Sequence, residues 1–313
     1  MSGSCPPDFV PLILDFDASV LPLGRGETRF DLGGWQEAVR FGCGHRTFAR
    51  LEDHIGSMLP RERGCVFLGS GDFHHLTLLL LRRLAKERAL PAASMDLVVC
   101  DNHPDNMRYF FGLHCGSWVR HAAALDCVRA VHIIGIHSPD ITLPHAWENY
   151  LSPFVRNKLH YWSVGVSAAW LGILGRAALA RRFDSADALV SAFASAPGES
   201  VYLSIDKDVL SPRAAPSTWD QGVFEPEHLD AIIRACAERL CGVDVCGDVS
   251  HYAYRSPLKR FLSRLDGLRG PDEPGAPRLF ESMRERHREI NQRLLSLLSS
   301  STGSRAATPT TFV

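Results

Sequence analysis

The sequence has few long apolar runs, no closely paired cysteines and no excess of charge of either sign. No apolar run in the 313 residues reaches the roughly 18 residues that a membrane-spanning helix needs, so we expect no membrane partner. The net charge of −1 and isoelectric point near 6.9 give no reason to expect a nucleic-acid partner. Residues 1–8 lack the basic and then apolar pattern of a signal peptide.

The nine cysteines are scattered along the chain, and none forms a Cys-x-x-Cys pair. Several of them lie inside apolar runs, where a thiol behaves as a small buried side chain. The pattern therefore predicts reduced thiols in a cytoplasmic protein and no disulfide framework.

Short apolar segments alternate with amphipathic ones along most of the chain. The apolar segments predict strands at 11–16, 65–68, 97–100, 131–135, 201–205 and 241–246. The amphipathic and Ala-rich segments predict helices at 47–59, 75–88, 168–182, 185–196, 226–240 and 280–298.

This alternation indicates an α/β fold: a three-layer, doubly wound, mostly parallel sheet with helices on both faces. No internal repeat and no linker divides the sequence, so we expect one domain over residues 1–298. Residues 299–313 are rich in Ser and Thr and are predicted to form a disordered tail.

Metal-ligating residue types follow three of the predicted strands. Asp101, His103 and Asp105 alternate after the strand at 97–100, and alternate residues of an extended backbone point to one face. Asp206 and Asp208 repeat this spacing after 201–205. A polar turn is also rich in Asp, Asn and Pro, so no single segment decides between a turn and a site. Open α/β sheets, however, place their sites beyond the carboxyl ends of strands, where all these residues fall.

A third strand end, after 65–68, carries His74 and His75, either of which could be a ligand. Four carboxylates and two imidazoles are too many for one tetrahedral zinc ion. They suit two divalent cations that share carboxylates, and an oxygen-rich set favours manganese over zinc. A bridging water between two such ions becomes hydroxide near neutral pH, so the predicted chemistry is hydrolysis.

Five segments together resemble the signature of the arginase (ureohydrolase) superfamily, a fold shared with the metal-dependent deacetylases. The segments are Gly71-Asp72-Phe73-His74, Asp101-Asn102-His103-Pro104-Asp105, 113–117, 204–212 and 242–250. The resemblance spans about residues 64–250 and keeps the family's order of motifs.

The resemblance implies a site for two Mn²⁺ ions and a hydrolase of guanidino C–N bonds. It implies one ion held by His74, Asp101, Asp105 and Asp206, and a second held by Asp101, His103, Asp206 and Asp208. His114 would move protons, and Asp248 would face the guanidinium group of the substrate.

The chain departs from the family pattern at several positions. An extra residue precedes the first histidine, which keeps His75 open as the ligand, and Ser211 replaces an acid. Gly247 is inserted before Asp248, which is shorter than the family's glutamate. These departures leave the substrate open among arginine, agmatine, guanidino acids and peptidyl arginine.

Two other functions remain on the same fold. One is an amide or deacetylase-type hydrolase that uses a single zinc ion, and the other is a non-catalytic metal-binding relative. The resemblance also implies that the chain forms a homo-oligomer.

Overall fold

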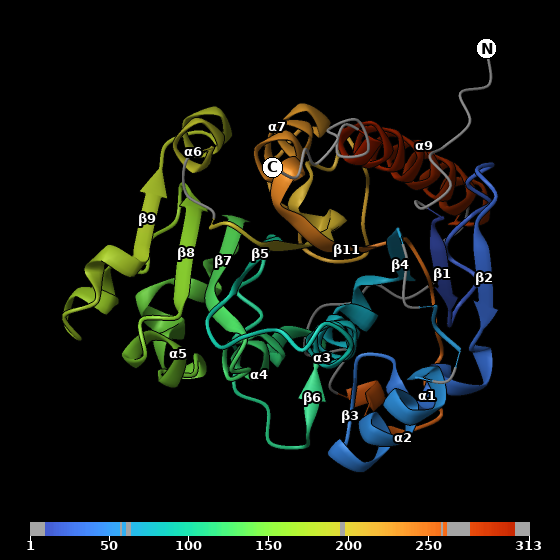
Figure 1. Ribbon diagram of the computed structural model, residues 1–313, viewed down its shortest axis with the longest axis horizontal. Coiled ribbons are helices and arrows are strands. Elements are labelled where there is room, and N and C mark those ends of the chain that lie inside the picture. The colour runs from blue at the N-terminus through green and yellow to red at the C-terminus, as the bar shows by residue number, and fades with distance from the viewer. Residues whose placement is uncertain are drawn as a thin grey trace, which may run out of the picture.

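A nine-stranded sheet, in which all strand pairs are parallel, forms the centre of the computed structural model (Figure 1). The structure describes residues 10–56, 58–60, 64–194, 198–257, 259–261 and 276–303. Across the sheet, the strands are β2 (Thr28–Asp31), β1 (Leu12–Asp15), β4 (Cys65–Gly69), β11 (Leu240–Cys246), β10 (Val201–Asp206), β5 (Met95–Cys100), β7 (Val128–Ile136), β8 (Leu159–Val164) and β9 (Ala180–Phe183).

Both faces of this sheet are buried, which explains the continuous apolar runs of its central strands. In β5, Leu97 and Val99 belong to one hydrophobic core, whereas Val98 and Cys100 belong to the other. Because successive side chains of a strand point to opposite faces, one apolar run supplies both cores.

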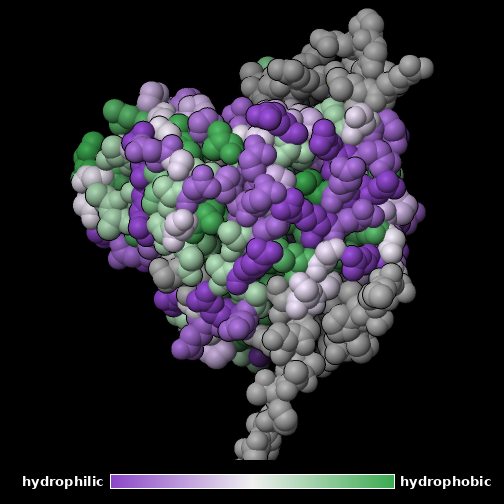
Figure 2. Space-filling view, turned by 90° about the horizontal axis from the view of Figure 1, so that it is seen from above, coloured by the Kyte–Doolittle hydropathy of each residue, from purple (hydrophilic) through white to green (hydrophobic). Residues whose placement is uncertain are grey.

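Helices cover the two faces separately (Figure 1). One core receives side chains from α2 (His45–Gly56), α3 (Thr77–Glu87), α4 (Val119–Ala123) and α5 (Ser152–Val155). The other receives them from α6 (Ala186–Phe193), α7 (Pro226–Cys236) and α9 (Ala276–Gly303). The outer surface of this second layer is largely hydrophilic over its centre, with hydrophobic residues gathered at the end near β9 (Figure 2).

The helix α7 shows why these segments fold and dock as they do. Pro226 occupies its first turn, where a missing N–H costs no hydrogen bond. Leu229, Ile232, Ile233 and Cys236 recur at helical spacing and are all fully buried. Each such apolar side chain contributes about 1.5–3 kcal/mol when it leaves water.

The strand order brings the three predicted ligand segments to one place. β4, β11, β10 and β5 are consecutive neighbours at the middle of the sheet. Because parallel strands end at the same edge, the residues that follow β4, β5 and β10 meet beyond it. A small antiparallel pair, β3 (Gly42–Cys43) and β6 (Leu113–His114), lies outside this sheet.

The structure confirms the predicted α/β class, the parallel sheet and the helices on both faces. Besides β3 and β6, it adds three strands of the large sheet that the sequence did not indicate, namely β2, β8 and β9. β2 and β9 lie at the two edges of the sheet and are largely exposed, so they carry no buried apolar run.

The predicted helix at 168–182 is wrong. Two short 3-10 turns, Ala169–Gly172 and Ala177–Leu179, are followed there by the edge strand β9. Gly175 has a φ of +66° between the two turns, which interrupts helical backbone. The segment's many alanines favour helix locally, but pairing of β9 with β8 decides its structure.

The last helix is longer than predicted, since α9 continues to Gly303. The rest of the predicted tail, residues 304–313, lies outside the described residues, and the single domain over 1–298 stays a prediction. Within the described parts of the chain, no helix is both long and apolar enough to cross a membrane.

Candidate metal centre

The predicted ligands line one cavity of about 550 Å³ at the carboxyl edge of the sheet. Asp206 ends β10, and Asp208 lies in the 3-10 turn η8 (Lys207–Val209) that follows. Asp101 and Asp105 follow β5, and His74 lies in η2 (Gly71–Leu76) after β4. In the described part of the chain, His, Asp and Cys side chains form three overlapping groups that could hold a metal ion.

The first group consists of His74, Asp101 and Asp105, all buried. The Nδ1 atom of His74 lies 2.9 Å from Oδ2 of Asp105 and 3.2 Å from Oδ2 of Asp101. His75 belongs to none of the groups. Of the two adjacent histidines, His74 is therefore the one that faces the carboxylates.

The second group consists of Asp101, His103 and Asp208. The Nδ1 atom of His103 lies 2.9 Å from Oδ2 of Asp208 and 3.7 Å from Oδ1 of Asp101. Asp101 therefore presents one carboxylate oxygen to each imidazole and is shared by the two groups.

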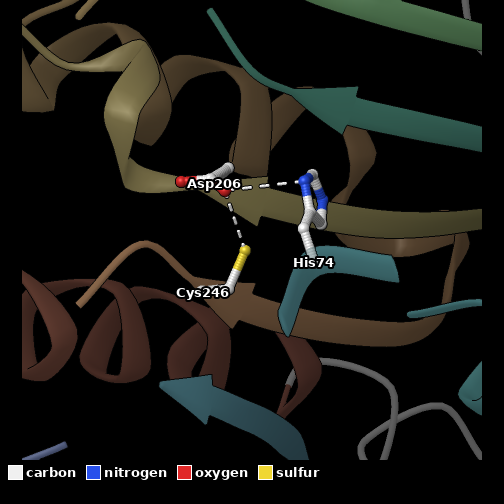
Figure 3. Close-up of side chains that lie close together, drawn as sticks. All are labelled: His74, Asp206 and Cys246. Carbon is white, nitrogen blue, oxygen red and sulfur yellow. Dashed lines mark hydrogen bonds and ion pairs between the residues drawn. The ribbon is translucent and has the colours of Figure 1, made fainter. Parts of the chain in front are cut away.

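The third group consists of His74, Asp206 and Cys246, which Figure 3 shows around the end of β10. Oδ2 of Asp206 lies 3.5 Å from Nδ1 of His74 and 3.1 Å from Sγ of Cys246. Asp206 is absent from the group that contains His103. The expected sharing of Asp206 between two ions thus has less geometric support than that of Asp101.

Backbone hydrogen bonds orient the carboxylates. Oδ1 of Asp101 accepts the N–H of His103 at 2.6 Å, Oδ1 of Asp206 accepts that of Asp208 at 3.1 Å, and Oδ1 of Asp208 accepts that of Asn102 at 3.1 Å. Asp105 has a left-handed φ of +46°, a conformation that Asp tolerates better than most residues. In two of these segments the carboxylate accepts the backbone N–H two residues further on, so local turns hold the alternating side chains in place.

The orientation of His74 depends on a buried hydrogen-bond network that no sequence motif indicated. Nε2 of His74 lies 3.0 Å from Oγ of Ser204, which donates to Oδ1 of Asp244 at 2.8 Å. Thr77 and Tyr202 also donate to the Asp244 carboxylate, at 3.0 and 2.7 Å. A carboxylate that holds a metal-ligating imidazole through a bridging group is a common way to fix its ring.

Crowding of the acids perturbs their protonation. Burial and then the charge of Asp101 raise the pKa of Asp105 to about 7. Burial and the charges of Asp206 and Asp101 raise the pKa of Asp208 well above its usual range. Burial alone would also raise the pKa of Asp101, but hydrogen bonds with His103 and His74 lower it. Removing negative charge from this cluster is therefore favourable.

The two imidazoles respond in the opposite sense. Burial would lower the pKa of His74, but its hydrogen bonds to Asp101 and Asp105 raise it well above the usual value. The charge of Asp208 and hydrogen bonds with Asp101 and Asp208 likewise overcome burial and raise the pKa of His103. Protonated imidazoles thus balance the acids here, a role that divalent cations can also fill.

His114 lines the same cavity as the acids. Its ring stacks on Tyr109 at 4.9 Å and lies nearly perpendicular to the ring of Phe41 at 4.2 Å between centroids. Burial, together with the charge of Lys259, lowers the pKa of His114 to about 3, so the imidazole is neutral near pH 7. Nδ1 accepts the N–H of Gly116 at 3.0 Å, which places the proton of the neutral ring on Nε2.

Asp248 does not line the cavity among the described residues. Its Oδ2 pairs with Nζ of Lys207 at 2.8 Å, and its Oδ1 accepts from Nδ2 of Asn291 in α9 at 3.0 Å. Both Lys207 and Asp248 are buried. This placement disagrees with the expectation that Asp248 faces a substrate, because a buried carboxylate needs a partner and Lys207 supplies it.

Other residues that line the cavity come from irregular segments, and no sequence pattern marked them as site residues. Phe41, Tyr109 and Trp219 supply aromatic surface, and Asp140 and Asp220 supply acids outside the three metal groups. Single polar and aromatic residues in irregular segments have no periodicity, so only the folded chain shows that they face the site.

The donor set fits divalent cations. Four carboxylates and two imidazoles from three strand ends line the same cavity. Asp101 belongs to two of the ligand groups, which suits two neighbouring ions. The predominance of carboxylate oxygen with some imidazole suits Mn²⁺.

The sheet is parallel, carries helices on both faces and has an acid-rich cavity at its carboxyl edge. The protein is thus an α/β protein with a candidate metal-binding site. A model of the Arginase family matches residues 30–249. The chain therefore belongs to the arginase family, whose members are hydrolases that act on C–N bonds.

One sequence relative is an uncharacterized protein of Thermotoga maritima, which is 29% identical over 197 residues. The match covers 62% of this chain, and the chain spans 62% of the length of that relative.

Solved structures show the same fold. Proclavaminate amidino hydrolase from Streptomyces clavuligerus aligns over 95% of this chain and 93% of its own, with 19% identity and a TM-score of 0.53. Formiminoglutamase from Trypanosoma cruzi, solved with Mn²⁺, aligns over 94% of each chain with 12% identity and a TM-score of 0.51. At these identities, the likeness extends to the fold alone.

Proposed function

We propose that the protein is a binuclear metal hydrolase that cleaves a guanidino C–N bond. The observation that supports this most directly is the position of Asp101, whose two oxygens face His74 and His103 separately. One group of ligands on each side of a shared carboxylate is the arrangement that two adjacent cations require.

The proposed ligands are His74, Asp101 and Asp105 on one side and Asp101, His103 and Asp208 on the other, with Asp206 beside His74. Manganese is the metal expected from the oxygen-rich donors. When bound, the two ions supply Lewis-acid activation of water near neutral pH and neutralise the crowded carboxylates.

His114 is assigned the proton-transfer step. Its neutral ring carries a proton on Nε2, and it lines the cavity that contains the acids. The amine that leaves when the C–N bond breaks needs a proton, and a positioned imidazole contributes about 10²–10⁴-fold to such a step.

The cavity walls favour a substrate with a positive, planar group. Asp140 and Asp220 are acids that the metal groups do not use, and Phe41, Tyr109 and Trp219 add aromatic rings, which attract cations, to the cavity lining. Arg108 also lines the cavity and could meet a carboxylate. Arginine, agmatine, guanidino acids and peptidyl arginine all remain within this substrate class.

The test is a metal analysis followed by a panel of these guanidino compounds, with urea and released amine as products. We expect two Mn²⁺ ions per chain, product release in the loaded wild type, and about 10²–10⁴-fold lower kcat with retained metal in His114→Asn. If no guanidino compound yields urea or amine, this function is wrong.

The same experiment separates the other functions of the fold. About one zinc ion per chain together with cleavage of an amide panel would assign a deacetylase-type hydrolase. Metal binding without turnover of either panel would leave a non-catalytic relative. The cytoplasmic location and the homo-oligomer stay predictions.

A further inference from the structure

Cys246 lies at a position that the proposed function leaves unused. It ends β11, between β4 and β10, and the sheet register pairs it directly with Asp206. Parallel neighbours in register point to the same face, which brings the thiol beside the Asp206 carboxylate. Cys246 is fully buried, and its Sγ lies 3.1 Å from Oδ2 of Asp206 (Figure 3).

The residue after Cys246 is a glycine, which allows β11 to approach Asp206 closely. Gly247 has a φ of +86°, and a Cβ atom there would clash with Oδ1 of Asp206 and lie 2.6 Å from the backbone nitrogen of Lys207. A larger residue would require the Asp206 carboxylate and the backbone at Lys207 to shift. The absence of a side chain at 247 therefore keeps the sulfur against the acid.

Cys246 also differs from the other cysteines. In the described residues, it is the cysteine that joins a group of potential metal ligands, with His74 and Asp206. The ligand atoms of these three residues lie within 4.8 Å of one another and come from three separate elements. Cys115 lines the cavity, but its Sγ lies beside the ring of His114, at 3.7 and 3.9 Å from the two nitrogens.

We propose that Cys246 is a thiolate ligand to the metal ion on the His74 side of the centre. This inference rests on the proposed metal centre and changes the metal expected in one of its two positions. When the sulfur binds the ion, the thiol proton passes to solvent, and no oxidant or reductant is needed.

A thiolate changes which metal that position prefers. Sulfur together with imidazole and carboxylate is a donor set for Zn²⁺ and Co²⁺, whereas Mn²⁺ prefers oxygen. The other position, with Asp101, His103 and Asp208, keeps oxygen-rich ligation. The two positions are therefore distinguished by one sulfur atom.

The simpler role for Cys246 is a hydrogen bond from its thiol to Asp206, which orients that carboxylate without touching the metal. Titration of metal-free protein with Co²⁺ separates the two roles, because only a thiolate–cobalt bond gives a near-ultraviolet sulfur-to-cobalt charge-transfer band. The experiment uses no substrate, so it is independent of the guanidino panel.

We expect the band in the wild type and in the matched control Cys115→Ser, and its loss in Cys246→Ser with cobalt still bound. We also expect Cys246→Ser to weaken Zn²⁺ binding by more than about 10-fold. Loss of a residue that only hydrogen-bonds to a metal ligand already weakens binding by about that factor, and loss of a ligand should weaken it more. Mn²⁺ affinity should change far less. If Cys246→Ser fails to fold, the wild-type spectrum still overturns the proposal when cobalt is fully bound without the band.

Four outcomes would overturn the proposal. Full cobalt occupancy of the wild type without the band reduces Cys246 to a hydrogen-bond donor and leaves the proposed function standing. A band that survives in Cys246→Ser or disappears in Cys115→Ser assigns the sulfur elsewhere. Absence of any cobalt binding removes both the thiolate and the proposed metal centre.

Discussion

At the scale of single residues, the two oxygens of Asp101 have different neighbours, and this distinguishes Asp101 from the other acids. Oδ2 faces His74, and Oδ1 faces His103. Asp208 contacts the imidazole of His103, and Asp206 belongs with His74. Substitutions of the three acids should therefore have different effects on metal content.

Asp101→Asn is expected to lose both metal ions, because the amide removes the shared negative charge. Asp208→Asn should lose mainly the ion on the His103 side, and Asp206→Asn mainly the ion on the His74 side. Elemental analysis of each variant after saturation with Mn²⁺ and desalting measures this. Equal loss in Asp101→Asn and Asp208→Asn would contradict the sharing of Asp101.

The adjacent histidines offer a matched pair of substitutions. His74→Asn should remove the ion on its side of Asp101, because Nδ1 of His74 is within 3.5 Å of three carboxylates. His75→Asn should keep both ions, since His75 belongs to no ligand group. Metal content decides, and loss of metal only in His75→Asn would restore the alternative that the sequence left open.

At the scale of elements, a buried ion pair ties the C-terminal helix to the metal site. Lys207 separates Asp206 from Asp208 in sequence, yet its side chain turns away to Asp248 and to Asn291 of α9, at 2.8 and 2.7 Å. The side chains of Lys207 and Asp248 are 0% and 1% exposed, so each charge depends on the other.

Lys207→Met should therefore lower the free energy of unfolding by about 3–5 kcal/mol, because it leaves the Asp248 carboxylate buried and unpaired. Urea denaturation of the metal-free protein measures this loss. The double variant Lys207→Met with Asp248→Asn should recover much of it.

The exposed pair Arg182–Asp184 provides the control for this ion pair. Arg182→Met should cost less than about 1 kcal/mol, as exposed ion pairs generally do. Equal losses in Arg182→Met and Lys207→Met would show that burial of the Lys207–Asp248 pair does not matter.

At the scale of the whole molecule, stability should depend on pH through buried histidines away from the metal site. His132 of β7 stacks on His160 of β8 at 4.8 Å and accepts the indole N–H of Trp162 at 3.2 Å. Burial, and then the charge of His160, lower the pKa of His132 to about 4, while Asp96 opposes and Arg129 adds to this shift.

An unfolded histidine titrates near pH 6.5, so between about pH 4 and 6.5 the unfolded chain binds more protons at His132 than the folded one. Its contribution to stability is complete above about pH 6.5 and is lost as the pH falls. His132→Gln keeps an acceptor for Trp162 but does not titrate. Its pH–stability curve should be flatter by up to about 1.4 kcal/mol per pH unit. Parallel curves for the two proteins in chemical denaturation would contradict this.

The sequence predicts much of this architecture. The central strands β1, β4, β5, β7, β10 and β11 are apolar runs, and burial on both sheet faces requires such runs. The edge strands β2 and β9 are largely exposed and have no such run, and the alanines of 168–182 favoured a helix that strand pairing replaced. An edge strand depends on the neighbouring strand for its hydrogen bonds, so its own sequence shows little strand pattern.

The sequence by itself determined which acids and histidines follow the central strands, since the period of two and the position after an apolar run are local properties. Only the tertiary structure decided that Asp101 is shared, that Cys246 lies against Asp206 and that Asp248 pairs with Lys207. These contacts join strands that are adjacent in the sheet but separated along the chain. Strand order and register, which no short segment encodes, place them together.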